Sequence, residues 1–479
     1  MSGYPNAHLS TLIVIFENYM NEHNFPENFL ASLSGEPGFA HEDFINVHKN
    51  SVSPTSIRLN PFKISPTKIG EQVPWCPEGY YLDTRPSFTF DPLFHAGCYY
   101  VQEASSMFIG HILKHIRQNN DEPVKILDLC AAPGGKSTLI SSAIGGDDLL
   151  VANEIIKTRV PVLCDNLNRW GAANTIETNN DPRDFSRLTG FFDIILVDAP
   201  CSGSGMFRKD PAAMNEWSEA NVNLCHQRQE RILADIYPAL KEDGHLIYST
   251  CSYSRQENEA ILDWLCAEFG MESLRIPIYK DWGIVETQSD RQKAWGYRFY
   301  PGKVKGEGLF AACLQKKGQT PQLPGFKSKG NQKLPLKEIE LVKTYLNIPD
   351  DFYYFMVNDD WLAINKAHKE NLDVLQRHLY IKKSGIRLGK LMGNDLIPDH
   401  ELALSIHINK DTVLQTELDY NQAIQYLRRE NIDLEINDKG WSLMQFEGHA
   451  LGWAKLLQNR INNYYPKELR ILSAGPPAP

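Results

Sequence analysis

Two cysteines stand shortly after apolar runs, at places where a folded chain can use a thiol for chemistry. Cys201 lies in DAPCSGSG after the run FDIILV, and Cys251 lies in STCS after GHLIY. A thiolate is a strong nucleophile, and the N–H groups of a loop at a strand end can lower the pKa of a thiol enough to form one. A free cysteine is more often a small buried apolar residue. We expect that role for the cysteines within apolar helix or strand patterns: Cys164, Cys225, Cys266 and Cys313.

The strands that must position these cysteines are predicted by apolar runs that alternate with helical patterns. The runs are rich in branched side chains and occupy residues 124–130, 148–154, 174–179, 192–200, 244–251 and 308–316. Such alternation is typical of an α/β fold, a parallel sheet covered on both faces. Ligands of these sheets bind at the carboxyl ends of the strands. We therefore expect Asp198, Cys201 and Cys251 at one edge of the sheet.

The loop after the first strand, LDLCAAPGGKST, ends like a phosphate-binding loop but lacks two of its features. Cys130 occupies the position where that loop needs its first glycine, and Pro133 has no N–H to offer a phosphate. Glu154 ends the next strand about 20 residues further on, where dinucleotide folds hold ribose hydroxyls with an acid. These features favour an adenosine ligand without a pyrophosphate, of which S-adenosylmethionine is the commonest. A plain glycine turn followed by a solvated Glu is the alternative.

Composition limits the class of protein. A chain of 479 residues is too long for one core and is expected to form several domains. Its net charge of -10 means that any nucleic-acid site must be a local patch. Nine cysteines without a CxxC pair disfavour disulfides and structural zinc. The run TLIVIF is too short to cross a membrane. We predict a cytoplasmic monomer that binds neither metal nor membrane.

Changes of pattern predict three domains and a linker. Residues 1–100 begin with the helical pattern LSTLIVIFENYM and continue as extended segments, which is typical of a small α+β domain. Residues 101–317 carry the alternation of strands and helices. Residues 318–337 are rich in Lys, Pro and Gly and predict a linker. Residues 338–479 combine a helix with short strands and end in a basic, aromatic stretch before the tail SAGPPAP, which we expect to be disordered.

Three segments together resemble the motifs of the RNA cytosine-5 methyltransferases: LDLCAAPGGKST, LVDAPCSGSGMFRKDP and YSTCSYSRQENEAIL. YYVQEASSM is similar to the family segment that leads into the catalytic domain. The resemblance implies a Rossmann-like class I methyltransferase domain with a mainly parallel sheet, preceded by a small α+β domain and followed by a PUA-like α+β domain. The domain order and the ending GHALGWAKLLQNRINNYYPKELR resemble the branch that acts on bacterial 16S ribosomal RNA.

The resemblance also implies a covalent reaction at a cytosine. Carbon 5 is too weak a nucleophile to take a methyl group unaided, whereas addition of a thiolate to carbon 6 turns the ring into a reactive enamine. The family pattern makes Cys251 the nucleophile and Cys201 the cysteine that assists release of the methylated base. The residues alone leave this order open, because DNA cytosine-5 methyltransferases attack from the cysteine that resembles Cys201. Asp198 is expected to hydrogen-bond the cytosine near N3.

S-adenosylmethionine is the methyl donor that the same resemblance implies. Glu154 is expected to hold its ribose, Asp181 its adenine edge and Asp198 its methionine end. For Asp181, a turn-forming role before Pro182 is the alternative. The loop expected to hold the donor consists of Cys130, Ala131, Ala132, Pro133, Gly134, Gly135 and Lys136.

An RNA substrate requires basic contacts, because the target base must leave its stack while its neighbours are held. The expected partner is 16S ribosomal RNA or the small subunit that contains it. Candidate RNA contacts are Arg58, Lys63, Arg208, Lys209, Lys455, Arg460, Lys467 and Arg470. Plain surface charge is the alternative for Arg208 and Lys209. The rival functions are methylation of transfer RNA and RNA binding by a non-catalytic ribosome assembly factor.

Overall fold

The computed structural model describes residues 25–63, 70–118, 121–318, 333–435 and 438–473. The helix predicted in LSTLIVIFENYM, residues 319–332 of the predicted linker and residues 474–479 of the predicted tail lie outside these ranges. The chain divides into two compact units. Unit 1 comprises Met1–Pro54, Ala199–Ile232 and Tyr248–Gln315, and unit 2 comprises Thr55–Asp198, Leu233–Ile247 and Lys316–Pro479.

Unit 2 contains a mainly parallel sheet, and its strands confirm the apolar runs of the sequence. They are β5 (Lys125–Asp128), β6 (Leu149–Asn153), β7 (Thr175–Thr178), β8 (Phe192–Asp198) and β9 (Leu240–Thr250), which continues into unit 1. An edge strand, β16 (Ile381–Ser384), completes the order β9-β8-β5-β6-β7-β16. β5 pairs in parallel with β6 and β8, and β6 pairs in parallel with β7. β6 is buried along its whole length, as expected for a strand covered on both faces.

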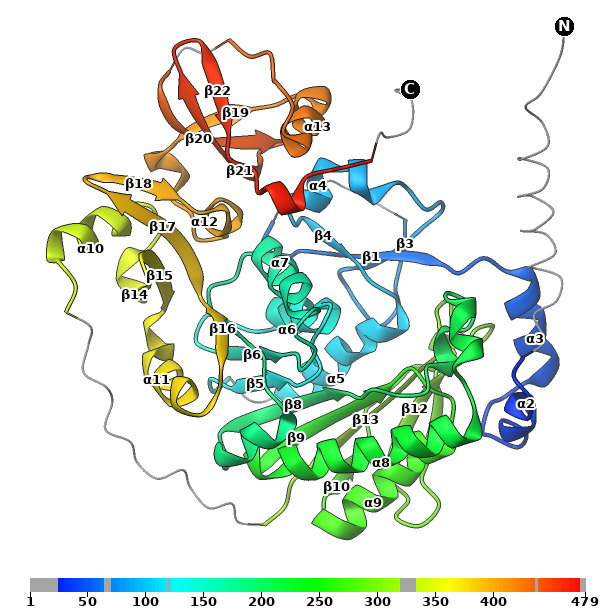
Figure 1. The fold of residues 1–479 in the computed structure, drawn as a ribbon. Helices are drawn as coiled ribbons and strands as arrows, with labels where there is room; N and C mark the ends of the chain where they lie inside the picture. Colours follow the sequence, from blue (N-terminus) through cyan, green and yellow to red (C-terminus); the bar gives the residue numbers. More distant parts are fainter. Residues whose placement is uncertain (1–24, 64–69, 119–120, 319–332, 436–437, 474–479) are drawn as a thin grey trace, which may run out of the picture. The chain divides into compact units, whose positions relative to one another are not determined.

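Three helices form a layer on this sheet: α5 (Phe108–Arg117), α6 (Gly135–Ala143) and α7 (Val160–Trp170). α6 contacts α5, α7 and β6, and α7 contacts β7 (Figure 1). α6 begins directly after Gly134, whose φ of 114° is readily adopted only by glycine. The glycine loop is therefore fixed between the carboxyl end of β5 and the first turn of α6.

An antiparallel sheet precedes this layer in unit 2. Its elements are β1 (Thr55–Leu59), β2 (Glu71–Gln72), β3 (Gly79–Leu82) and β4 (Tyr99–Val101), in the order β2-β3-β1-β4, with the short helix α4 (Pro92–His95) before β4. Ile57 and Tyr99 from this sheet share one apolar cluster with Tyr426 and Leu427 of the C-terminal region. The two ends of unit 2 are thus joined by a common core.

The C-terminal region of unit 2 contains two four-stranded sheets. The first has the order β14 (Phe352–Val357), β15 (Asp360–Asn365), β17 (Ile386–Met392) and β18 (Asp395–Pro398). The second has the order β19 (Leu414–Glu417), β20 (Gly440–Phe446), β21 (His449–Leu457) and β22 (Arg460–Asn463). The α-helices among the described residues of the region are α10 (Leu336–Lys343), α11 (Lys369–His378), α12 (His400–Leu404) and α13 (Tyr420–Arg428).

Unit 1 combines helices with an antiparallel sheet. The helices that the structure describes in it are α2 (Phe29–Ser32), α3 (His41–Asn50), α8 (Glu219–Ile236), which ends within unit 2, and α9 (Glu259–Phe269). Its sheet contains β10 (Glu272–Leu274), β11 (Val285–Gln288), β12 (Trp295–Phe299) and β13 (Leu309–Gln315). β13 confirms the apolar run at 308–316 and pairs with β12 and β10. Phe29, Phe44, Phe207 and Tyr253 form the aromatic centre of the unit.

Among the helices that the structure describes, none is both long and apolar enough to span a bilayer. The same residues contain no group of three or more His, Cys, Asp or Glu arranged to hold a metal ion.

Candidate active site

The glycine loop of unit 2 is held in shape by hydrogen bonds along its backbone. Ala131 N–H donates to Asn153 O (2.8 Å), and Asn166 Nδ2 donates to Pro133 O (2.7 Å). A Cβ added to Gly134 would lie 3.2 Å from Asn166 Cβ, so a side chain there would press the loop away from α7. The loop is a close-packed turn whose backbone a ligand can approach.

Lys136 and Asp198 form an ion pair beside this loop. Lys136 Nζ lies 2.7 Å from Asp198 Oδ2, and the two side chains are 16% and 32% exposed. Lys136 belongs to the first turn of α6, and Asp198 is the last residue of β8. The pair therefore places a charged carboxylate at the carboxyl end of the sheet, the edge at which we expected Asp198.

Asp128 is a buried carboxyl beneath the loop that we did not select from the sequence. Its Oδ2 accepts from Ser137 Oγ (2.6 Å), whereas Oδ1 has no hydrogen-bond partner among the described residues. Burial raises the pKa of Asp128 to about 7, and the negative charge of Asp198 adds to the rise. The sequence offered one signal for Asp128, an acid inside the apolar run VKILDLC. Burial of a carboxyl group costs free energy, so an acid in a buried strand indicates a specific role.

Cys130 lies within the loop and is chemically unlike the other two candidate cysteines. Burial raises the pKa of its thiol, and the negative charges of Asp128, Asp198 and Glu154 raise it further. Cys130 is therefore a neutral thiol at physiological pH and is unsuited to nucleophilic attack.

Glu154 and Asp181 already have partners in unit 2. Glu154 is buried after β6; its Oε1 accepts from Ile156 N–H (2.8 Å), and its Oε2 lies 3.4 Å from Arg159 Nη1. Asp181 Oδ1 accepts from Arg183 N–H (3.1 Å) and caps a short helix. The turn-forming role that we considered for Asp181 is thus present, and its contact with adenine stays a prediction.

Cys201 and Cys251 lie side by side in unit 1. Their Sγ atoms are 3.3 Å apart, well beyond the roughly 2.05 Å of a disulfide, and both thiols are free. The hydrogen bond with Cys251, together with burial, raises the pKa of Cys201 well above its ordinary value. Cys201 therefore keeps its proton at neutral pH and can donate its S–H to Cys251 Sγ.

Glu257 ties together the loops that carry these cysteines. Its carboxylate accepts from Ser202 N–H (2.8 Å), Ser202 Oγ (2.5 Å) and Ser252 Oγ (2.5 Å), and its side chain is 0% exposed. Ser202 follows Cys201 directly, and Ser252 follows Cys251 directly. Glu257 was not selected from the sequence; its only signal was an acid six residues after Cys251.

Backbone contacts add a second connection between the cysteine loops. Ala199 N–H donates to Ser249 O (2.8 Å), and Gly205 N–H donates to Cys251 O (2.7 Å). A Cβ added to Gly205 would lie 2.6 Å from Gly308 O. The close Sγ–Sγ approach therefore depends on a backbone arrangement that a larger residue at Gly205 would disturb.

Arg58 is placed where it cannot contact RNA. It is 0% exposed, and its guanidinium donates to Gln102 Oε1 (2.8 Å) and Thr138 Oγ1 (2.7 Å). The same group stacks over the ring of Trp170 at 4.5 Å. The prediction of an RNA contact is wrong for Arg58, because its charge is used to join β1 to α6 and α7.

Two further basic candidates are also engaged within the protein. Lys63 Nζ donates to Ala96 O (2.7 Å) and Arg169 O (2.6 Å), and burial lowers its pKa to about 8. The Arg208 side chain is 6% exposed and lies 3.0 Å from Glu307. For Arg208, the alternative of plain surface charge is wrong, since its charge is buried and paired; its phosphate contact stays a prediction.

The remaining basic candidates reach the surface. Lys455 is partly exposed on β21, with its Nζ 5.3 Å from the centre of the Trp441 ring. The exposed candidates are Lys209 in unit 1 and Arg460, Lys467 and Arg470 near the C-terminus. Their contact with RNA stays a prediction.

Three family models match separate stretches of the chain. Residues 25–104 match the N-terminal domain of 16S rRNA methyltransferase RsmF. Residues 114–315 match 16S rRNA methyltransferase RsmB/F, and residues 413–471 match the methyltransferase RsmF PUA domain. These matches confirm the predicted order of an N-terminal domain, a Rossmann-like methyltransferase fold and a PUA domain; the exact boundaries stay predictions.

Whole-chain relatives and solved structures agree with these models. Ribosomal RNA small subunit methyltransferase F of Aliivibrio fischeri strain MJ11 is 31% identical over 475 residues, covering 93% of this chain and 97% of that protein. The protein of the same name from Pectobacterium atrosepticum is 38% identical over 305 residues, covering 60% of this chain and 61% of its own. A solved methyltransferase homolog from Pyrococcus horikoshii has a TM-score of 0.50 and 28% identity, covering 60% of this chain and 93% of its own. The chain therefore belongs to the family of ribosomal RNA small subunit methyltransferase F.

Proposed function

We propose that this protein methylates carbon 5 of a cytosine in 16S ribosomal RNA, with Cys251 as the covalent nucleophile and S-adenosylmethionine as the methyl donor. The observation that carries the proposal is the pair of free thiols whose Sγ atoms lie 3.3 Å apart. The names of the relatives, which are methyltransferases of small-subunit ribosomal RNA, support the class of substrate.

The residues of unit 2 fit the proposed donor. When bound, S-adenosylmethionine supplies a methyl group on a positively charged sulfur. The glycine loop from Cys130 to Lys136 offers a close backbone approach, and Asp128 Oδ1 is a buried acceptor without a partner among the described residues. Glu154 would hold the ribose, Asp181 the adenine edge and Asp198 the methionine end. Buried or charged carboxyl groups around the loop favour a cationic ligand.

Cys251 would activate the base by covalent addition. Its thiolate forms a bond to carbon 6, and the electron pair of the C5–C6 bond then makes carbon 5 nucleophilic. The S–H of Cys201, hydrogen-bonded to Cys251 Sγ, favours negative charge on that sulfur. Asp198 would hydrogen-bond the ring near N3, where charge develops during the addition.

Release of the methylated base requires the reverse movement of electrons. Water accepts the C5 proton, the electron pair of that C–H bond restores the C5–C6 double bond, and the bond between Sγ and carbon 6 breaks with its electron pair returning to Cys251. Cys201 stands next to the sulfur that receives this pair, so its S–H can stabilise the returning thiolate. Chain connectivity supports the joint action of Asp198 and Cys201, because only two residues separate them in the sequence. The distance between their Cα atoms therefore cannot exceed about 11 Å.

The two cysteine roles can be tested by substitution. We expect Cys251→Ala to abolish both methylation and the covalent RNA adduct seen on a denaturing gel. Cys201→Ala is expected to accumulate that adduct, because addition proceeds while release is impaired. Cys266→Ala is the matched control, a partly exposed free cysteine on α9 of the same unit, and should behave like the unmodified protein. Exchanged phenotypes for the first two variants would overturn the assignment.

The substrate can be tested with a labelled methyl donor and separated RNA pools. We expect label in naked 16S ribosomal RNA or in small subunits that lack the modification, and 5-methylcytosine after digestion to nucleosides. Label confined to transfer RNA would overturn the ribosomal substrate. Tight RNA binding without label in any pool would instead indicate a non-catalytic assembly factor.

A further inference from the structure

Unit 2 contains a pocket that the proposed reaction does not use. It has a volume of about 530 Å³, within the range of ligand sites in proteins. Its walls come from the loop 85–89, Phe94 on α4, Tyr100 and Val101 on β4, and Asn166 and Arg169 on α7. We call it the Arg85 pocket.

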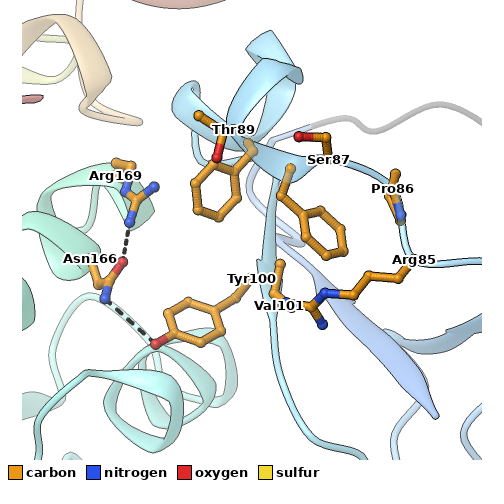
Figure 2. Close-up of a pocket in the computed structure, with 10 residues that line it drawn as sticks. Arg85, Pro86, Ser87, Thr89, Tyr100, Val101, Asn166 and Arg169 are labelled. Carbon is orange, nitrogen blue, oxygen red and sulfur yellow. Dashed lines mark hydrogen bonds between the residues drawn. The ribbon is translucent and has the colours of Figure 1, made fainter. Parts of the chain in front are cut away.

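Two arginines face this pocket from different walls. Figure 2 shows Arg85 extending from its loop towards Val101 and Arg169 directed at Asn166 from α7. Within the residues that the structure describes, neither guanidinium forms an ion pair with a carboxylate, and burial lowers the pKa of Arg169. The carboxylate of Asp165 lies near enough to Arg169 to act on it electrostatically but forms no ion pair with it. Two cations without an ion-pair partner in one pocket favour an anionic ligand, and a guanidinium fits a phosphate well.

Aromatic rings form much of the remaining wall. The guanidinium of Arg85 lies 5.5 Å from the centre of the Phe88 ring, and that of Arg169 lies 4.5 Å from the centre of the Phe94 ring. Tyr100 contributes a third ring. Ring faces bind flat bases by stacking with little preference for sequence. Cationic and aromatic walls together match a nucleotide, which has both a phosphate and a base.

The pocket is directly connected to the glycine loop. Asn166 Nδ2 donates to Pro133 O (2.7 Å) and lies 3.5 Å from the Tyr100 hydroxyl, as the dashed line in Figure 2 shows. A Cβ added to Gly135 would lie 3.3 Å from Tyr100 Cε1. Tyr100 and Asn166 therefore separate the pocket from the proposed donor site by the thickness of one side chain.

We propose that the Arg85 pocket binds one nucleotide of the single-stranded RNA substrate, near the nucleotide that is methylated. The phosphate lies between Arg85 and Arg169, and the base stacks on Phe88 or Tyr100. An RNA strand can enter and leave because Arg85, Pro86 and Ser87 are exposed. The proposal rests on RNA being the substrate, but it does not depend on carbon 5 chemistry.

The test is equilibrium binding of single-stranded fragments of 16S ribosomal RNA, measured by fluorescence anisotropy over a range of salt concentrations. Arg85→Ala should weaken binding about threefold to tenfold and reduce the slope of log K against log salt by about 0.7, the value for one phosphate contact. Phe88→Leu keeps an apolar side chain but loses the ring, and should weaken binding about tenfold with an unchanged salt slope.

Arg275→Ala is the matched control. Arg275 also stacks over a ring, that of Trp295 at 4.6 Å, but its charge is paired with Glu286 at 2.8 Å, so RNA affinity should not change. Unchanged affinity and salt slope for both pocket variants would overturn the proposal, whether or not the enzyme methylates RNA. A second contrary result is possible: the protein binds 5′-CMP at micromolar concentration, and Arg85→Ala removes this binding without changing RNA affinity. That result would assign the pocket to a free nucleotide and would also overturn the proposal. Pocket-dependent RNA binding without methylation would refute only the proposed reaction.

Discussion

At the scale of single residues, Glu257 determines how the two cysteines meet, although its carboxylate bonds to neither sulfur. It accepts two hydrogen bonds from Ser202 and one from Ser252, the residues that follow Cys201 and Cys251. A buried carboxylate with several donors is a rigid connection, because each donor would be left unpaired if the group moved. Glu257 is therefore a positioning residue.

Glu257→Gln should separate positioning from RNA binding. The amide keeps the size of the side chain but replaces one acceptor oxygen with an NH2 group, which conflicts with the donors of Ser202 and Ser252. We expect kcat to fall at least tenfold and KM for RNA to stay within about twofold. Glu268→Gln, an exposed substitution on α9, serves as the control in the same steady-state assay. A variant with unchanged kcat would show that Glu257 does not position the thiols.

Asp128 should make stability depend on pH. Its folded pKa of about 7 lies above the ordinary value of 3.8, so the folded protein retains a proton that the unfolded chain releases. The stabilisation of the folded protein by this proton is fully present below pH 3.8 and is lost as pH rises to about 7. Asp128→Asn removes this titration. Between pH 5 and pH 8, the free energy of unfolding of the unmodified protein, measured with urea, should fall by up to about 3 kcal/mol more than that of the variant. Parallel pH curves would contradict the assignment.

At the scale of elements, the turn from β5 into α6 depends on one glycine. Gly134 has a φ of 114°, and any side chain there would also meet Asn166 and Leu163 of α7. Both effects act on the backbone of the loop, so a substitution should alter the surface offered to a ligand rather than the sheet below it.

Gly134→Ala is therefore expected to weaken binding of S-adenosylhomocysteine at least tenfold by isothermal titration calorimetry. The backbone conformation is strained for alanine by about 1–3 kcal/mol, and relief of that strain moves the loop. Gly270→Ala is the matched control, because Gly270 also has a positive φ, 63°, with open space where a Cβ would stand. Equal effects of the two substitutions on ligand affinity would contradict this account.

At the scale of the whole molecule, the C-terminal region of unit 2 is part of the methyltransferase sheet. β16 pairs antiparallel with β7, and Tyr380 N–H donates to Asn180 Oδ1 (2.8 Å) close to the predicted adenine contact. Lys383 on β16 lies between Glu177 of β7 (3.7 Å) and Glu401 of α12 (3.6 Å), and all three side chains are mostly buried. The C-terminal region therefore stabilises the edge of the sheet.

Lys383→Ala should reveal this dependence. The substitution leaves Glu177 buried without its cation, and such a loss lowers the free energy of unfolding by about 3 kcal/mol. Lys382→Ala, at the exposed neighbouring position on the same strand, should change the free energy of unfolding by less than about 0.5 kcal/mol. Chemical unfolding of both variants measures the difference. Equal stabilities would show that the region contributes little to the sheet.

The sequence alone predicts the central strands because each is a short apolar run. β5 to β9 and β13 were all found in this way, although β9 begins four residues before the predicted run. The motifs around Cys201, Cys251 and Gly134 were recognisable because their residues are contiguous. The predictions failed where long polar side chains are buried by distant partners. Arg58 is an example, because its partners Thr138 and Trp170 come from other elements.

The amino-acid sequence by itself determined the family and the central strands, and it predicted the candidate site residues, because these depend on local pattern and residue type. Only the tertiary structure decided which charges are buried, that Glu257 joins the two cysteine loops, and that β16 extends the sheet beside β7. These features depend on contacts between residues far apart along the chain, and no local pattern of apolar and polar residues encodes the distance between them.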